Sequence, residues 1–142
     1  MIAIKLAETE AEVRATHRVM VQLRTHLDEE AYAAQVALQR AQDNYHIVAL
    51  FDDGVIRAVA GFRLATGLAL GHYLYVDDLV SDATVRSKGY GAQLLAWMGA
   101  YGKEHGATSV HLDSGVQRHS AHRFYLRERM DIVFYHFRKA ID

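Results

Sequence analysis

The residues that point most clearly to chemistry form the stretch RSKGYG, residues 86–91. Gly89 and Gly91 stand one residue apart, beside the charged Arg86 and Lys88, and an apolar helical pattern follows directly. Glycines let successive backbone N–H groups turn towards one point, and the start of a helix adds the positive end of its dipole. The pattern predicts a binding site for a phosphate or pyrophosphate group. The alternative is a tight turn that needs glycines and binds nothing.

Two common phosphate-binding motifs do not fit this stretch. A Rossmann fingerprint needs a third glycine where this chain has Leu94, and too little chain follows Asp113 to complete such a domain. A P-loop needs Gly-Lys-Ser or Gly-Lys-Thr at its end, which is absent from the stretch. If the glycines bind a ligand, they belong to another kind of phosphate site.

The composition predicts a single domain, 1–142, of ordinary globular type. Hydrophobic residues make up 51% and charged residues 23% of the chain, and it has no cysteine, which excludes disulfides and thiolate chemistry. The formal net charge of -1 lacks the basic excess of a nucleic-acid-binding protein. No apolar run approaches the roughly 18 residues of a membrane span, and the N-terminus lacks a secretory signal. We therefore expect a cytoplasmic protein with no membrane partner and no strong nucleic-acid signal.

The elements that must position the glycine loop follow the order β-α-α-β-β-β-α-β-α-β. Thr9 and Glu12 form a capping box for a helix that runs to about Leu27, and a second helix spans 28–42. Asp53-Gly54 predicts a hairpin between two strands, and the strand pattern at 132–140 predicts a last strand. This order predicts an α/β (mixed α+β) fold, a central mixed and twisted sheet of about six to seven strands flanked by about four helices.

The context of the glycine loop carries a family resemblance. Residues 86–91 fit R-x-x-G-x-G, after the strand residues DDLV (77–80) and before an amphipathic helix. Further along, residues 121–125 read A-x-x-F-Y before the predicted last strand. In this combination essentially the whole chain resembles the GNAT superfamily of acyl-CoA-dependent N-acyltransferases. The resemblance implies the GNAT fold and an acyltransferase of EC class 2.3.1, which passes an acetyl group from acetyl-CoA to a primary amine of a small molecule or peptide.

The resemblance also implies which residues hold acetyl-CoA. The backbone amides of the glycine loop would bind the pyrophosphate of the co-substrate. The strand before the loop would pair its backbone with the pantetheine arm, so side-chain identity there matters little. The cofactor-binding residues implied are Leu79, Val80, Ser81, Arg86, Ser87, Lys88, Gly89, Tyr90, Gly91 and Ala92.

Direct attack of an amine on a thioester, in a ternary complex, needs a base. An alkylamine with a pKa of about 10.4 is mostly protonated at neutral pH, so a group must take its proton directly or through water. We predict Asp78 as this base, with Asp77 or an ordered water as alternatives. Because side chains alternate along a strand, the two aspartates are expected on opposite faces, with at most one facing the substrate.

The same step needs an oxyanion donor and an acid. A backbone N–H near Val80 could stabilise the oxyanion. The resemblance implies that Tyr125 protonates the leaving thiolate; the alternative is a tyrosine packed in the core. The family frequently carries asparagine at the position of Arg118, so this chain departs from the family pattern in the contacts of that helix with coenzyme A.

The histidines and Asp113 are weaker candidates. His119 and His122 share a helix face, but without cysteines or an H-E-x-x-H pattern we predict no metal site. His136 is expected either to face the acceptor pocket or to pack in the core, and Asp113 either lines that pocket or starts a turn.

Two alternative functions stay open. The chain could be a non-catalytic acyl-CoA-binding sensor or assembly module with the same fold, for which loss of Asp78 and Tyr125 would not matter. It could also be an acetyltransferase that modifies nucleic acid, although its charge gives no support. Exposed-edge residues at 132–137 suggest a homodimer.

Overall fold

The computed structural model describes residues 1–85 and 88–142. These residues divide into two compact units, Met1–His111 and Leu112–Asp142. The first unit carries nearly all of a five-stranded sheet with the strand order β1-β2-β3-β4-β5. The strands are β1 (Ile2–Ala7), β2 (Tyr45–Asp52), β3 (Val55–Gly67), β4 (Gly71–Ser81) and β5 (Val110–Leu112).

The sheet is mixed. Strands β1 to β4 pair antiparallel. The segment leading into β5 runs parallel to β4. Thr108 N donates to His72 O and Leu74 N donates to Ser109 O, so residue numbers rise in the same direction in both segments. The hairpin between β2 and β3 turns at Asp53 and Gly54, both with positive φ, as the sequence predicts.

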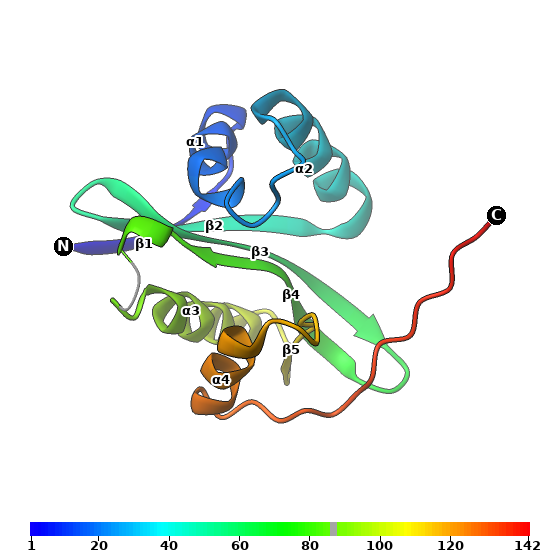
Figure 1. Ribbon diagram of the computed structural model, residues 1–142. Helices are drawn as coiled ribbons and strands as arrows, with labels where there is room; N and C mark the ends of the chain where they lie inside the picture. The colour runs from blue at the N-terminus through cyan, green and yellow to red at the C-terminus, as the bar shows by residue number, and fades with distance from the viewer. Residues whose placement is uncertain (86–87) are drawn as a thin grey trace. The chain divides into compact units, whose positions relative to one another are not determined.

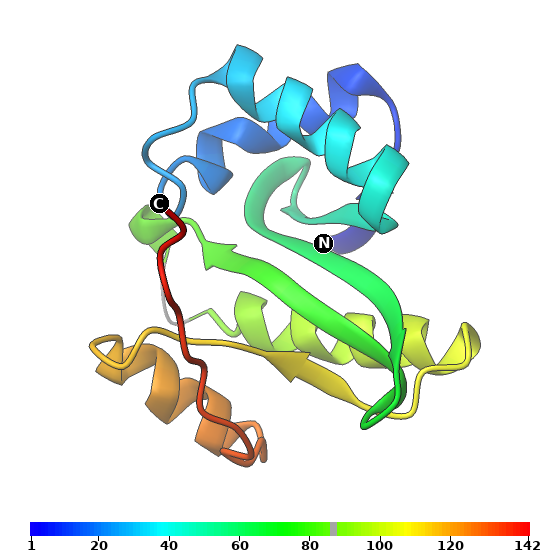
Figure 2. The same ribbon diagram turned by 90° about the vertical axis from the view of Figure 1, so that its right-hand side faces the viewer.

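Helices cover both faces of the sheet. In Figures 1 and 2, α1 (Glu10–Met20) and α2 (Glu29–Asp43) lie on one face and α3 (Tyr90–Glu104) lies on the other. On the first face, Val13 and Val36 pack in one buried cluster with Ile47 of β2. On the second face, Phe62 of β3 contacts the rings of Trp97 and Tyr101. The mixed fold with helices on both faces is thus as expected.

Side-chain caps mark the start of the first two helices. Thr9 Oγ1 accepts from Glu12 N while Glu12 accepts from Thr9 N, which confirms the predicted capping box. Asp28 caps α2 through Ala31 N. None of the helices within the described residues is long and apolar enough to cross a membrane.

The first helix is shorter than predicted, because α1 ends at Met20 and not near Leu27. Beyond it the backbone tightens into i to i−3 bonds, from Gln22 N to Val19 O and from Leu23 N to Met20 O. The segment then turns, and the side chain of Arg24 contacts Asp78 of β4.

The second unit contains α4 (His119–Arg127), close to the predicted helix. The predicted last strand at 132–140 is wrong: these residues form no regular element, and side chains such as Phe134 and Tyr135 are exposed. Strand propensity is realised by pairing and burial against neighbours, and no described strand pairs with this segment. The described sheet therefore has five strands, fewer than predicted.

Candidate active site

The glycine loop leads into α3 as the sequence predicts. Gly89 is the residue before the helix and adopts φ +78°, a left-handed conformation that glycine takes without strain. Lys88 is exposed beside it, and Gly91 and Ala92 lie in the first turn, whose N–H groups have no intrahelical partner. The predicted binding residues Arg86 and Ser87 lie outside the described residues.

Tyr90 has a side-chain role that the sequence did not reveal. It is buried, and its hydroxyl donates to Asp52 Oδ2 over 2.6 Å. This bond lowers the pKa of Asp52 and raises that of Tyr90. Asp52 is the last residue of β2, so the start of α3 is tied to the end of a strand.

The strand residues predicted to meet the pantetheine arm are the last of β4. Leu79, Val80 and Ser81 lie opposite Ala60, Val59 and Ala58 of β3. Val80 also packs against the buried cluster on the α1 and α2 face.

A β-bulge in β4 brings both aspartates to one face. Gly61 of β3 pairs with Asp78, but its neighbour Phe62 pairs with Val76. Asp77 is therefore an extra residue in β4 with no residue of β3 paired opposite it. Tyr45 and Arg63 stand directly opposite each other and so share a face. Because Asp78 bonds Tyr45 and Asp77 bonds Arg63, the expectation of opposite faces is wrong. A bulge re-aims side chains at the point where alternation would separate them.

Asp78 is held by two partners. Arg24 donates from Nε to Asp78 Oδ1 over 2.7 Å, and its Nη2 donates to Asp77 O over 2.8 Å. Tyr45 donates to Asp78 Oδ2 over 2.5 Å. The Asp78 side chain is 12% exposed and that of Arg24 is 41% exposed, so this ion pair lies at the protein surface and is partly accessible to solvent.

Asp77 forms a two-pronged ion pair with Arg63, over 2.8 and 3.0 Å. Burial raises the pKa of Asp77 above its ordinary value, although the Arg63 guanidinium opposes that effect. The Arg63 guanidinium also lies over the ring of Tyr75, 4.9 Å from its centroid. The face thus carries two carboxylates and two guanidinium groups beside an aromatic ring.

Two buried tyrosines lie beneath this charge cluster. Burial raises the pKa of Tyr45 well above its ordinary value, and the charge of Asp78 adds to the effect. Burial also raises the pKa of Tyr32 to about 12, and its hydroxyl shares a 2.7 Å hydrogen bond with Thr16. Both hydroxyls therefore keep their protons at neutral pH.

The second unit holds the remaining candidates. Burial raises the pKa of Tyr125, on α4, and the nearby Arg118 guanidinium opposes that effect. His136 Nδ1 lies 2.5 Å from Asp113 Oδ2, and His122 Nε2 lies 2.7 Å from Gly115 O. Within residues 1–85 and 88–142, no three histidine, aspartate or glutamate side chains are grouped to hold a metal ion.

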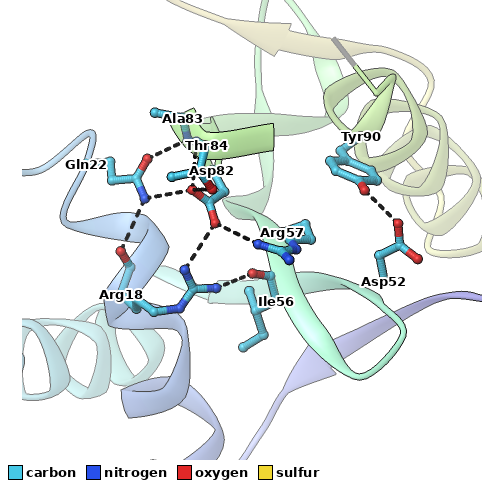
Figure 3. A network of polar contacts seen from close by, with 9 residues as sticks. All are labelled: Arg18, Gln22, Asp52, Ile56, Arg57, Asp82, Ala83, Thr84 and Tyr90. Atoms are coloured by element: carbon cyan, nitrogen blue, oxygen red, sulfur yellow. Dashed lines mark hydrogen bonds and ion pairs between the residues drawn. The ribbon is translucent and has the colours of Figure 1, made fainter. Parts of the chain in front are cut away.

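Sequence reasoning missed a buried carboxylate, Asp82, immediately after β4. Its partners come from α1, β3 and the short 3-10 helix η1 (Ala83–Val85), as Figure 3 shows. Its position just before the predicted loop was the only signal in the sequence, because its ionic partners, Arg18 and Arg57, lie far away along the chain.

Comparison with known proteins supplies the family. Residues 7–130 match the Acetyltransferase (GNAT) family. The chain is 35% identical over 142 residues to the protein named "Uncharacterized N-acetyltransferase YhdJ" of Bacillus subtilis (strain 168), covering 99% of this chain and 100% of that protein. It is 28% identical over 120 residues to an aminoalkylphosphonate N-acetyltransferase of Salmonella typhimurium, covering 84% of this chain and 78% of that one.

A solved structure shows the same fold. An aminoglycoside N-acetyltransferase in complex with CoA superposes with a TM-score of 0.78 at 15% identity, covering 98% of this chain and 96% of the other. The family match, the sequence relatives and the shared fold agree with one another. The chain belongs to the GNAT family of acetyltransferases and is an acyltransferase.

Proposed function

We propose that the protein transfers an acetyl group from acetyl-CoA to a primary amine of a small molecule or peptide. One observation carries this proposal: after the end of β4, Gly89 adopts a left-handed conformation and the first-turn N–H groups of α3 have no intrahelical partner. The chain in which this occurs belongs to the GNAT family. A free helix start favours an anionic group such as a pyrophosphate.

The loop and strand would share the binding of acetyl-CoA. Residues 86–92 would bind the pyrophosphate through backbone N–H groups, helped by the charges of Arg86 and Lys88. Leu79, Val80 and Ser81 would pair their backbone with the pantetheine arm. The aminoglycoside N-acetyltransferase with bound CoA supports an acyl-CoA partner in this fold.

Asp78 and Tyr125 are the proposed catalytic residues. Asp78 would take a proton from the acceptor ammonium, directly or through a water, so that the nitrogen lone pair attacks the thioester carbon. A carboxylate has about four lone-pair sites, so Asp78 keeps acceptor capacity beside its bonds to Arg24 and Tyr45. A backbone N–H near Val80 would stabilise the oxyanion. As the carbon–sulfur bond breaks, Tyr125 would protonate the thiolate and regain a proton from the attacking nitrogen, directly or through water, yielding a neutral amide and free CoA.

One observation favours the alternative of a non-catalytic acyl-CoA-binding protein. Asp78 is engaged by an arginine and a tyrosine, the arrangement of a structural ion pair. A protein of this kind would bind acetyl-CoA without releasing its thiol to any amine. A cytoplasmic location and a homodimer also stay proposals from the sequence.

The test is binding followed by turnover. We expect acetyl-CoA and CoA, but not NAD, to raise the melting temperature, because a ligand of the folded state stabilises it by mass action. Thiol release with a panel of amines would then reveal the acceptor, and the absence of cysteine removes background from the protein itself. Aminoalkylphosphonates belong in the panel because one relative carries that name.

The outcomes separate the two functions. Stabilisation by CoA together with amine-dependent thiol release supports the acetyltransferase. Stabilisation without release from any amine supports the binding protein. No stabilisation by either CoA species at saturating concentration contradicts both.

A further inference from the structure

The segment that leads into the glycine loop is anchored by Asp82, a carboxylate that the proposed chemistry does not use. Its side chain is only 1% exposed. Oδ2 accepts from Arg18 Nη1 over 3.1 Å and from Arg57 Nη1 over 3.3 Å. A buried charge is stable only when it is paired and hydrogen-bonded, so the geometry of Asp82 depends on these partners.

The other oxygen of Asp82 holds η1. Oδ1 accepts from Thr84 N over 3.1 Å and from Thr84 Oγ1 over 2.9 Å. Gln22 bridges the same region, since its Nε2 donates to Asp82 Oδ1 over 3.4 Å and its Oε1 accepts from Ala83 N over 2.8 Å. Hydrogen bonds from Thr84, followed by the Arg18 pair, lower the pKa of Asp82 and keep it charged.

A second β-bulge aims Arg57 at this carboxylate. Leu50 of β2 pairs with Ala58, but Phe51 pairs with Ile56, which leaves Arg57 as an extra residue in β3. The carbonyl oxygen of Arg57 accepts from Asp82 N over 2.8 Å. Backbone and side chain of Arg57 therefore both hold the residue that ends β4.

The far side of the loop has its own anchor. Tyr90, the first residue of α3, is tied to Asp52 at the end of β2. Figure 3 shows the Asp82 cluster and the Tyr90–Asp52 pair together. The stretch between Asp82 and Tyr90, which contains Arg86 to Gly89, is thus held at both ends by polar contacts to the sheet or to α1.

We infer that Asp82 is a positioning residue for the binding of coenzyme A. It holds η1 against α1 and β3, and so sets where the loop begins relative to the first turn of α3. Fixing the two ends of the loop before binding reduces an entropy cost that would otherwise weaken affinity. The inference rests on the proposed function, because it assigns the glycine loop to coenzyme A.

The experiment measures the affinity for CoA, by calorimetry, in wild type, Asp82→Asn and the milder Gln22→Ala. We expect the dissociation constant to rise at least about tenfold in Asp82→Asn and about threefold in Gln22→Ala. At saturating acetyl-CoA, kcat should stay within about threefold of wild type, so that the loss falls on KM for acetyl-CoA. Glu30→Gln, which breaks the exposed Arg14–Glu30 pair of α1 and α2, is the matched control and should bind as wild type.

A merely structural role would lower the melting temperature and leave the dissociation constant of the folded protein unchanged. A folded Asp82→Asn variant with a dissociation constant within about twofold of wild type would overturn the inference. If Asp82→Asn does not fold, the dissociation constant of Gln22→Ala decides in the same way. The hydrogen bonds of Gln22 are exposed or partly exposed, so their loss should leave the protein folded.

Hydrogen exchange of the ligand-free protein separates this inference from the proposed function. Amides in peptides covering 83–92 should exchange faster in Asp82→Asn and Gln22→Ala than in wild type, while those of α2 should not change. Unchanged exchange overturns the anchoring role whatever binds. Wild type that binds no CoA, with exchange altered as expected, overturns the proposed function and the link to coenzyme A, but leaves the anchor.

Discussion

The hydroxyl of Tyr45, on β2, donates to Asp78, on β4, across the intervening strand β3. The contact is made possible by Gly61, because a Cβ atom there would lie 1.8 Å from the Tyr45 oxygen and 2.6 Å from Asp78 Oδ2. Side chains of strands that are not neighbours normally do not meet. A glycine in the middle strand and a bulge beside it let a buried hydroxyl support the proposed catalytic carboxylate.

Replacing Tyr45 by Phe should lower the free energy of unfolding by about 1.5–3 kcal/mol, because the lost hydrogen bond goes to a charged group. Tyr32→Phe is the matched control. It removes the hydroxyl of a similarly buried tyrosine whose partner, Thr16, is neutral, so the loss should be about 0.5–1.5 kcal/mol. Urea unfolding at pH 7 measures both; equal losses would show that the charge of Asp78 does not strengthen the bond.

Gly61→Ala should destabilise the protein by about 1–3 kcal/mol, because the new methyl group forces Tyr45 and Asp78 apart in a packed core. Acetyl transfer should fall with it if Asp78 is the base. Gly99→Ala, on α3, is the control: its Cβ would meet no atom within 4 Å, and alanine favours a helix by about 1 kcal/mol over glycine. Similar unfolding midpoints for the two variants would contradict the packing argument.

As the pH is lowered, the free energy of unfolding should fall more steeply for the wild type than for Asp82→Asn. The folded pKa of Asp82 lies below the unfolded value of about 3.9, so its stabilisation is fully present above that pH and is lost as the pH falls towards the folded pKa. The difference between the free energies of unfolding of the two proteins, from urea titrations between about pH 5 and pH 2, should therefore shrink as the pH falls. Parallel curves would mean that the Asp82 charge adds no stability.

Asp78→Asn should reduce kcat by about a hundredfold or more, the usual contribution of a general base. Asp77→Asn provides a comparison on the same face, because Asp77 is held by both prongs of Arg63, and should cost less than about tenfold. Steady-state kinetics with a productive amine checks both. A larger loss in Asp77→Asn would make that residue the base, and small losses in both would leave the task to water.

Tyr125→Phe should lower kcat by about a hundredfold at saturating substrates with little change in CoA affinity, if its proton goes to the leaving thiolate. Burial raises the pKa of this tyrosine, which keeps it protonated and able to donate at neutral pH. Phe124→Leu, a change at the neighbouring aromatic residue, is the control for packing of α4. Equal effects of the two substitutions would point to packing and not to acid catalysis.

The amino-acid sequence by itself determined those features that depend on residues close together along the chain. The capping box of Thr9 and Glu12, the turn at Asp53-Gly54 and the glycine before α3 are set by contacts within a few positions. The same local order, with the R-x-x-G-x-G pattern, was enough to predict the GNAT family and a mixed sheet flanked by helices.

Tertiary structure alone decided the features that join distant parts of the chain. Asp82 and Arg18 are 64 positions apart, and Asp78 and Arg24 are 54 apart, so no local pattern could pair them. The bulge at Asp77 turned two alternating carboxylates to one face because the register with β3 slips there. Residues 132–140 have strand propensity without a partner strand among the described residues. Propensity and alternation are properties of a segment, whereas register, pairing and buried charge networks are properties of the segments that meet.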